Sequence, residues 1–487
     1  MIEPVHGDPA TDLVGTALSA VFAPRPAPAP LLDAALAAVF EPAPASTAPG
    51  APRTPAPLPH LQALDGLRGV AIALVVLFHF GFTWMTGGFV GVDVFFVLSG
   101  YLITGLLLDE AARTGTVDLL RFWARRARRL LPALCLLLLV LAAVAAVDPR
   151  LVPPGALRSN GLAALFYVEN WRLALQTHAQ QVAQIFRPSP LLHTWSLAVE
   201  EQFYLLWPLV VLAVRPARRS RLWAVVVVGA AGSAAAMAAM SVAGVAPLPI
   251  YYDTGARAFE LLIGAALALA APLTRSAPRS STACPASGLP TARPASDLPT
   301  AHPGPDRPEA SPKPPKTKGR PTRPALPAPG RLAGPTGLVA LAGVLVFATV
   351  ADGVDAPWVL RGGLVAASLA AALLIWSVVA RPAWPAARLL AWPPLVALGR
   401  ISYAVYLWHW PALILLTSAT TGLRANALRG VQLAFTLGAA LVSRYLVENP
   451  ARRLAPGMAV RRLVLPVGTT ALACALVGIV IARPPAF

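Results

Sequence analysis

Arg68 and His79 lie eleven positions apart in the first long apolar segment, and both residue types can do chemistry. Eleven residues are close to three turns of α-helix, so the two side chains share one helix face, roughly 16 Å apart. Histidine takes or gives a proton near neutral pH, and arginine binds anionic groups. A single buried histidine more often makes a structural hydrogen bond, but an arginine on the same face favours a catalytic role. We expect Arg68 at the cytoplasmic end of this helix and His79 beyond its middle.

A second candidate is the arginine-rich string FWARRARRLLP at 122–132, which we expect at the end of a cytoplasmic loop. Its four arginines are Arg125, Arg126, Arg128 and Arg129. Guanidinium groups stay charged and bind phosphate oxygens through paired hydrogen bonds, so the string is typical of a site for a phosphorylated donor. The alternative is that these arginines only anchor the next helix at the cytoplasmic surface.

The string LLHTWSLAVEEQFYLLWPL at 191–209 contains a third group of ionisable residues: His193, Glu200, Glu201 and Tyr204. Neighbouring residues on a helix point about 100° apart, so we expect only one of the two glutamates to face the protein interior. We expect that carboxylate to orient the imidazole of a catalytic histidine or to bind an acceptor from the external side.

Further polar residues fall within the apolar segments. A charged group inside a membrane costs at least about 2.5 kcal/mol on insertion scales, so such residues usually face the protein and mark function. On this basis Asp65, Asp93 and His409 are candidate supporting residues. Two pairs instead have the spacing of neighbours that neutralise each other on one helix face, and we interpret both as structural: Arg257 with Glu260, and Arg444 with Glu448.

The composition indicates an integral membrane protein. Of the 487 residues, 56% are hydrophobic and 13% are charged, whereas soluble domains have about 25% charged residues. The formal net charge of +18 does not indicate a nucleic-acid binder, because so few charged residues cannot build a solvated binding surface. The three cysteines are too far apart, in too apolar a context, for a metal centre or a disulfide framework. We therefore expect no metal and no nucleic-acid partner.

Apolar runs of the length that crosses a bilayer recur along the chain. They predict eleven transmembrane helices, at 69–86, 88–108, 130–147, 195–214, 222–245, 256–274, 332–350, 362–380, 396–416, 428–447 and 463–482. The small residues Gly88, Gly91 and Gly100 of the second run are typical of close helix packing. A twelfth run, 156–171, is short and polar, and we expect it not to cross.

The charges of the connecting segments predict the orientation. With the N-terminus inside and 156–171 not crossing, the internal connections hold 26 Lys and Arg, and the external segments hold 7. This agrees with the positive-inside tendency, so we expect the C-terminus outside. Two Pro-rich segments, the tail 1–60 and the basic linker 275–331, have the composition of disordered chain. We expect 61–450 to form the membrane domain around that linker, and 451–487 to hold a basic loop and the eleventh helix.

In order along the chain, the strings LDGLRGVAIALVVLFHF, GGFVGVDVFFVLSGYLIT, FWARRARRLLP, LLHTWSLAVEEQFYLLWPL, RAFELLIG, LGRISYAVYLWHWP and VENP resemble the acyltransferase 3 family of integral-membrane acyltransferases. The likeness covers about 61–450. It assigns the family's Arg-X10-His signature to Arg68 and His79. It assigns the RxxR signature to Arg126 and Arg129, although Arg125 and Arg128 have the same spacing.

The resemblance implies transfer of an acyl group, usually acetyl, from cytoplasmic acyl-coenzyme A to a hydroxyl group. Acceptors in such a family are surface glycans, lipid-linked saccharides or small secondary metabolites, and the location implied is the bacterial plasma membrane. Many members carry a C-terminal extracytoplasmic SGNH domain, whereas this sequence ends at Phe487. We therefore expect a separate extracytoplasmic partner to complete glycan transfer, or a smaller acceptor.

The motifs and the resemblance lead to one mechanistic hypothesis. We expect Arg68, Arg126 and Arg129 to hold the phosphates of acetyl-coenzyme A, a co-substrate rather than a bound cofactor. His79 would then act as the general base, with Glu200 or Glu201 beside it. The competing interpretation is a transporter or flippase for a glycoside or a lipid-linked saccharide, with the buried His and Glu as a proton relay. The sequence lacks the paired broken helices that many such transporters have.

Overall fold

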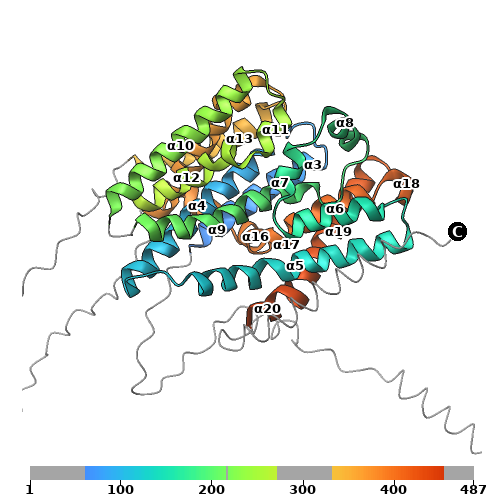
Figure 1. Ribbon diagram of the computed structural model, residues 1–487, viewed down its shortest axis with the longest axis horizontal. Helices are drawn as coiled ribbons and strands as arrows, with labels where there is room; N and C mark the ends of the chain where they lie inside the picture. Colours follow the sequence, from blue (N-terminus) through green and yellow to red (C-terminus); the bar gives the residue numbers. More distant parts are fainter. Residues whose placement is uncertain (1–60, 215–217, 271–331, 454–487) are drawn as a thin grey trace, which may run out of the picture. The chain divides into compact units, whose positions relative to one another are not determined.

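The computed structural model describes residues 61–214, 218–270 and 332–453, which form helices joined by short turns (Figure 1). In chain order the elements are α3 (Gln62–His79), α4 (Val90–Thr114), α5 (Leu119–Val147), α6 (Pro154–Leu165), α7 (Glu169–Ala174), α8 (His178–Phe186), η1 (Leu192–Thr194), α9 (Trp195–Val214), α10 (Arg219–Val242), α11 (Pro247–Tyr252), α12 (Thr254–Ala270), α13 (Ala333–Val350), η2 (Val359–Gly363), α14 (Leu364–Ala380), α15 (Pro385–Leu390), α16 (Pro393–Arg400), α17 (Ser402–Leu415), α18 (Ser418–Thr421), α19 (Ala425–Val442), η3 (Ser443–Glu448) and α20 (Asn449–Arg453). The predicted tail 1–60, the linker 275–331 and the eleventh helix 463–482 lie outside the described residues.

Eight of the described helical segments are long and apolar enough to cross a bilayer. The protein is therefore all-α and integral to the membrane, as the composition predicts. Two more predicted segments are also helical: 256–274 corresponds to α12, with 17 residues, and 396–416 corresponds to the consecutive helices α16 and α17. Helix α6, within the twelfth run, has 12 residues and is about 18 Å long, too short to cross about 30 Å of hydrocarbon. The total of eleven and the inside-to-outside direction stay predictions.

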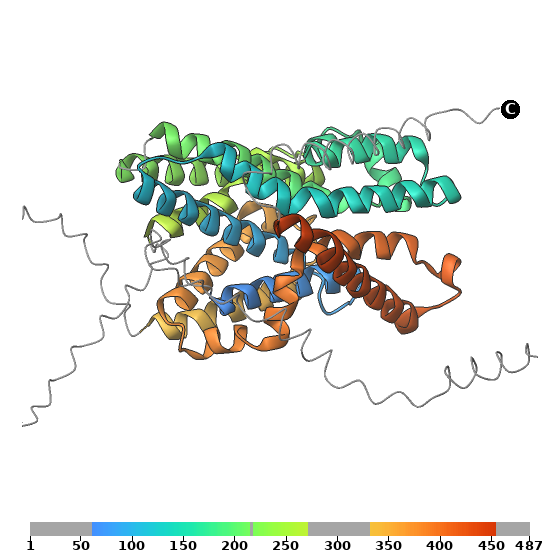
Figure 2. The ribbon, with the colours of Figure 1, turned by 90° about the horizontal axis from the view of Figure 1, so that it is seen from below.

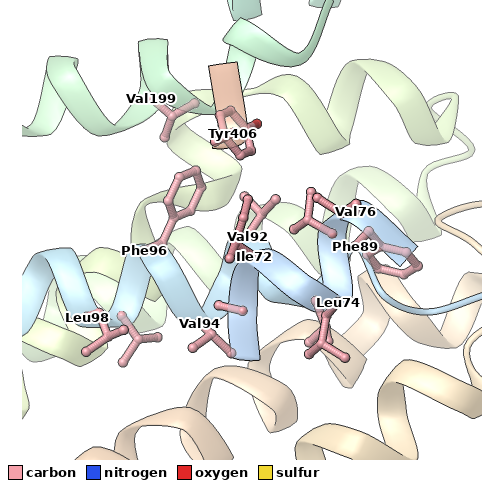
Figure 3. Packing of buried hydrophobic residues seen from close by; sticks show 14 of the residues in the cluster. Ile72, Leu74, Val76, Phe89, Val92, Val94, Phe96, Leu98, Val199 and Tyr406 are labelled. Atoms are coloured by element: carbon pink, nitrogen blue, oxygen red, sulfur yellow. The ribbon is translucent and has the colours of Figure 1, made fainter. Parts of the chain in front are cut away.

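The helices α3, α4 and α12 pack closely because glycines face their neighbours. A Cβ atom on Gly91 would lie 2.3 Å from the carbonyl oxygen of Ala71 in α3, and one on Gly100 would lie 1.9 Å from that of Leu261 in α12. The packing role predicted for these glycines is confirmed. Figure 3 shows apolar side chains of α3 and α4 side by side, with Phe96 pointing toward Val199 of α9 and Tyr406 of α17.

Hydrogen bonds between helices fix their relative directions. Arg68 and His79 of α3 contact Ser402 and His409 of α17 in the same order, so these two helices run in parallel. Helices α4 and α9 are also parallel, because Ser99 bonds to Glu200 and Thr104 accepts a hydrogen bond from Trp207. Figure 2 shows the long helix α5 running past the C-terminal helices, where it contacts η3 and α20. The parallel pairs agree with the alternating crossings predicted from the hydropathy.

Two helices begin well before the apolar runs that predicted them. Helix α3 spans Gln62–His79 rather than 69–86, because the chain turns after Phe80 at Gly81, which has φ +70°. Arg68 therefore lies nearly two turns inside the helix rather than at its cytoplasmic end, and His79, expected beyond the middle of the helix, is its last residue. Helix α5 begins at Leu119, after the N-cap Asp118, whose side chain accepts a hydrogen bond from the backbone N–H of Arg121 at 2.9 Å. Its arginines thus lie on a helix, and the prediction of a loop there was wrong.

The predicted helix 396–416 is interrupted. Helix α16 ends at Arg400, and α17 begins at Ser402 after a break at Ile401. The break follows a close contact with α3, where a Cβ atom on Gly399 would lie 1.7 Å from the carbonyl oxygen of Asp65. The same contact carries an ion pair, with Arg400 Nε 3.6 Å from Asp65 Oδ2. Asp65, predicted as a supporting residue, therefore joins α3 to α16.

Candidate functional site

A cavity of about 480 Å³ lies between the end of α4 and the beginning of α5. We call it the arginine cavity, and its lining residues are Leu106, Glu110, Arg113, Thr114, Arg121, Phe122, Arg125, Arg126 and Arg129. The turn between the helices builds it, because α4 stops at Gly115 in the left-handed conformation (φ 80°) and α5 starts four residues later. Five arginines and one glutamate make this a cavity for a polyanion.

The arginines of the cavity differ in how far they are already paired. Arg125 contacts Glu110 at 3.2 Å, and Arg113 contacts Asp109 at 3.2 Å. Arg126 instead lies over the rings of Phe122 and Tyr204, 5.5 and 5.2 Å from their centroids. Among the described residues, the buried Nε of Arg129 has no hydrogen-bond partner. Arg126 and Arg129 therefore retain hydrogen-bonding capacity for a ligand.

The two possible registers of the RxxR signature are distinguished by the helix. Arg126 and Arg129 are three residues apart on α5 and both line the arginine cavity. Arg125 also lines it, but Arg128 does not, and the side chain of Arg128 is buried elsewhere with interactions of its own. The register Arg126/Arg129 is the one in which both arginines face the same cavity.

A polar network leads from the arginine cavity into the bundle. Tyr204, under the guanidinium of Arg126, donates a hydrogen bond to Glu200 Oε1 at 2.5 Å. The hydroxyl of Ser99 on α4 also donates to Glu200 Oε1. Glu201 interacts electrostatically with Arg126 and Arg129. Both carboxylates are half-buried and meet polar groups, because α5 packs on one side of α9 and α4 on another. That only one of them faces the interior stays a prediction.

A second, smaller cavity of about 40 Å³ lies beyond this network. Arg68, Glu200 and Ser402 line it together with Ser196, Tyr403, Tyr406 and the apolar residues Val92, Phe95, Phe96 and Leu197. Arg68 donates a hydrogen bond to Ser402 Oγ at 3.3 Å and interacts electrostatically with Arg129 and Glu200. Arg68 is thus next to the arginine cavity but does not line it, in contrast to the expectation that it lies at the cytoplasmic mouth. The reason is the earlier start of α3.

His79 lies in a cluster of histidines at the far end of α3. Its Nδ1 is 3.0 Å from Nε2 of His409, and the ring of Trp410 packs edge-on at a centroid distance of 4.9 Å. The ring of His193 is 5.5 Å from that of His409, and neither nitrogen of His193 has a hydrogen-bond partner among the described residues. The imidazole that contacts His79 is therefore that of His409, and not a carboxylate of Glu200 or Glu201 as expected. The alternative role of these glutamates, binding the acceptor, stays a prediction.

The cluster is tied to the second cavity through Tyr406. The Tyr406 hydroxyl is 2.5 Å from Ser196 Oγ and donates to the carbonyl oxygen of His193 at 2.8 Å. The tyrosine ring is 5.3 Å from the ring of His409. Since Tyr406 also lines the second cavity, that cavity adjoins the histidine cluster. The α3 face with Arg68 and His79 therefore meets α17 at both positions, as the three-turn spacing predicts.

Asp93 lies in a buried ionic cluster rather than in either cavity. Arg257 Nη2 contacts Asp93 Oδ1 at 3.2 Å, and Arg257 Nε contacts Glu260 Oε1 at 2.6 Å, with all three side chains at most 1% exposed. The guanidinium also lies 4.4 Å from the ring centroid of Tyr251. This confirms the predicted pairing of Arg257 with Glu260 and adds Asp93, which joins α4 to α12. The pair Arg444–Glu448 is likewise present, at 3.1 Å.

Arg257→Met is expected to lower the free energy of unfolding by about 3–5 kcal/mol, because it leaves two carboxylates buried without their cation. The measurement is the thermal midpoint of the full chain in detergent. The matched control replaces the whole cluster (Asp93→Asn, Arg257→Met, Glu260→Gln), and its thermal midpoint should fall less than that of the single variant. If the thermal midpoint of the single variant falls as much as that of the triple variant, or less, Arg257 does not neutralise these carboxylates.

Sequence reasoning missed several residues of the site. Arg113 and Arg121 flank the α4–α5 turn, and their charge alone is indistinguishable from ordinary cytoplasmic anchoring. Ser99, Ser402 and Tyr406 are uncharged, so nothing in hydropathy or charge marks them. The N-cap Asp118 was the available signal, since it predicts that the arginines follow on a helix.

Comparison with known proteins bears on what this site does. Residues 61–448 match a protein family described as an acyltransferase domain. The chain is 32% identical over 398 residues to the peptidoglycan O-acetyltransferase OatA of Listeria monocytogenes, covering 81% of this chain and 56% of that protein. It is 36% identical over 362 residues to the putative peptidoglycan O-acetyltransferase YrhL of Bacillus subtilis, covering 74% and 49%. It is 30% identical over 398 residues to the O-acetyltransferase OatA of Staphylococcus aureus, covering 81% and 57%.

The chain spans about half the length of these curated relatives, and no solved structure matches it. The matched domain includes all the helices that form the two cavities and the histidine cluster. The class of protein is therefore an integral-membrane protein whose described helices form an acyltransferase domain. The chain belongs to the acyltransferase 3 family, which confirms the resemblance inferred from its motifs.

Proposed function

We propose that the chain moves an acetyl group from acetyl-coenzyme A at the cytoplasmic face to a hydroxyl of a cell-wall glycan at the outer face. The main support for the proposal is that the arginine cavity lies next to the helix that holds Arg68 and His79. The arginine cavity suits the donor's phosphates, and it adjoins Arg68, whose helix ends at His79. The relatives named peptidoglycan O-acetyltransferases support the glycan acceptor.

The donor's phosphates are assigned to the arginine cavity. Coenzyme A has a pyrophosphate next to its pantetheine arm and a separate phosphate on the ribose. Arg126 and Arg129 are the cavity arginines that interact with the interior network, so they suit the pyrophosphate nearest the arm. Arg113 and Arg121 line the same cavity toward the α4–α5 turn and suit the ribose phosphate. This division leaves the arm free to enter the bundle.

The pantetheine arm then passes Arg68 and continues toward His79, roughly 16 Å further along α3. The second cavity, about 40 Å³, is the opening on this route, and its side chains have to move to admit the arm. Arg68 can donate to the thioester carbonyl or to the amides of the arm, because its hydrogen bond to Ser402 leaves other N–H groups available.

At the histidine cluster the reaction is a transfer from sulfur to oxygen. His79 takes the proton of the acceptor hydroxyl while its oxygen attacks the thioester carbonyl carbon. The C–O bond forms, the C–S bond breaks, and the imidazolium returns the proton to the leaving thiolate. The products are an acetyl ester and free coenzyme A. A positioned general base typically contributes about 10²–10⁴-fold to such a step.

Arg113→Ala/Arg121→Ala is expected to reduce the preference for acetyl-coenzyme A over its 3′-dephospho analogue by about tenfold. A charge-assisted hydrogen bond is worth about 1.5–3 kcal/mol, and these two arginines are assigned to the phosphate that the analogue lacks. The measurement is kcat/KM for both donors in membranes. Arg126→Ala serves as the comparison, because it should weaken both donors alike. An unchanged preference in the double variant would remove Arg113 and Arg121 from donor recognition.

The assigned acceptor is tested in cells. Mass spectrometry of the cell-wall glycan with and without the gene should show acetyl increments that are lost on deletion and restored by the wild-type chain. Complementation with His79→Ala should not restore them. Unchanged acetylation of that glycan in the deletion strain would reject this acceptor and direct the search to lipid-linked saccharides or secondary metabolites.

A further inference from the structure

The direction of the hydrogen bond between His79 and His409 follows from a third group. Nδ1 of His409 lies 2.6 Å from the backbone carbonyl oxygen of Tyr406. A carbonyl oxygen can only accept a hydrogen bond, so Nδ1 of His409 carries the proton. A neutral imidazole has one N–H, and Nε2 of His409 is therefore an acceptor.

This assignment fixes the tautomer of His79. Nε2 of His409 is 3.0 Å from Nδ1 of His79, and since it accepts, His79 has to donate from Nδ1. The proton of a neutral His79 is then on Nδ1, which leaves the lone pair on Nε2. A free imidazole side chain prefers the opposite tautomer, with the proton on Nε2, so His409 reverses the ordinary preference.

We propose that His409 is the positioning residue of this enzyme: it holds His79 in the Nδ1–H tautomer and presents the basic Nε2 to the acceptor hydroxyl. The inference rests on the proposed function, in which His79 is the general base. His409 occupies the place that a carboxylate often takes beside a catalytic histidine, but it does so as a neutral group. A neutral partner suits a position inside an apolar bundle, where an unpaired carboxylate is costly to bury.

The surroundings of His409 hold it rigidly enough for this role. Its side chain is fully buried, at 0% exposure. The titratable rings facing it are those of His79, Tyr406 and His193, at centroid distances of 5.1, 5.3 and 5.5 Å. The ring of Trp410 packs edge-on against His79, and Trp410 itself donates to the carbonyl oxygen of Ser189 at 2.8 Å. None of these facing groups is a carboxylate that could replace His409 as acceptor.

The first test compares two variants at this position in membranes with acetyl-coenzyme A labelled in the acetyl group. A glutamine side chain there places an amide oxygen near the position of the imidazole Nε2, whereas a leucine removes the acceptor at similar bulk. We expect His409→Leu to lower kcat by about 10²-fold and His409→Gln to stay within about tenfold of wild type. The donor KM should stay unchanged in both variants, because His409 lies outside the arginine cavity. A merely structural role would not give this rescue by glutamine.

The second test reads the tautomer directly in the wild-type chain and uses a variant only to assign the signal. Nitrogen-15 NMR of the histidine-labelled full chain in lipid nanodiscs should show His79 with the proton on Nδ1, assigned by the signal lost in His79→Ala. A wild-type His79 protonated on Nε2 would overturn the proposal. A wild-type kcat in His409→Leu, measured together with an inactive His79→Ala, would also overturn the proposal. That outcome would leave the proposed function intact. Activity in both His409→Leu and His79→Ala would instead reject the proposed base together with its positioning residue.

Discussion

His79→Ala is expected to lower kcat for acetyl transfer by about 10²–10⁴-fold, the contribution of a positioned general base. The donor KM should change little, because His79 is at the end of α3 and the donor's phosphates are assigned to the arginine cavity at the beginning of α5. The measurement is transfer of labelled acetyl from acetyl-coenzyme A to isolated cell-wall glycan in membranes, over a range of donor concentrations.

The matched control for this variant is His178→Ala. His178 is the first residue of α8, and its side chain is exposed, so its removal should leave kcat unchanged. Equal expression and equal thermal midpoints of the two variants separate a catalytic loss from a folding defect. Wild-type kcat in a folded His79→Ala protein would remove His79 from the chemical step.

Arg126→Ala/Arg129→Ala is expected to raise the donor KM by about 10²-fold. Each arginine is assigned charge-assisted hydrogen bonds to phosphate, worth about 1.5–3 kcal/mol, and about 1.4 kcal/mol corresponds to a factor of ten. The kcat at saturating donor should fall much less, since neither guanidinium is assigned to the reacting atoms. The measurement is the full dependence of rate on acetyl-coenzyme A concentration.

The control for the arginine pair removes the same charge elsewhere. Arg218 and Arg221 lie at the beginning of α10, are exposed, and belong to a connection predicted on the same side of the membrane. Arg218→Ala/Arg221→Ala should therefore leave the donor KM unchanged. A donor KM that rises equally in both double variants would reduce Arg126 and Arg129 to topology anchors, the alternative that their sequence context leaves open.

The periodicity of the sequence predicted which residues share a helix face, and it did so correctly for Arg68 and His79. A three-turn spacing fixes the face whatever the helix packs against, and both residues contact α17. The glycines of α4 were also predictable, because small residues on an apolar helix serve close packing in most cases.

The partners across helices were not predictable in the same way. His79 and His409 are 330 positions apart, so their hydrogen bond depends on how α3 and α17 pack and not on any local pattern. The same holds for Asp93, which looks like an isolated intramembrane acid in the sequence and is paired with Arg257 in the fold. Glu200 shows the converse: Glu200 or Glu201 was predicted beside His79, and Glu200 instead accepts hydrogen bonds from Ser99 and Tyr204.

Helix ends were misplaced for a physical reason. Hydropathy windows exclude charged residues, so they began the third helix at 130, after its arginines, although the helix extends back to Leu119. The N-cap Asp118 and the left-handed Gly115 are local signals that hydropathy does not read. Correcting that boundary matters for function, because it is the helical geometry of α5 that brings Arg126 and Arg129 to one cavity.

The proposed reaction takes an acetyl group across the bundle, from a donor on one side to a hydroxyl on the other. The direct test uses sealed inside-out membrane vesicles with labelled acetyl-coenzyme A outside, which cannot cross the bilayer, and cell-wall glycan trapped in the lumen. We predict alkali-labile label on the lumenal glycan, lost in His79→Ala and retained in His178→Ala. Movement of unlabelled glycan across the membrane would contradict this transfer and favour a transporter. Label found only on acceptor outside the vesicles, on the donor side, would contradict it and favour a one-sided enzyme.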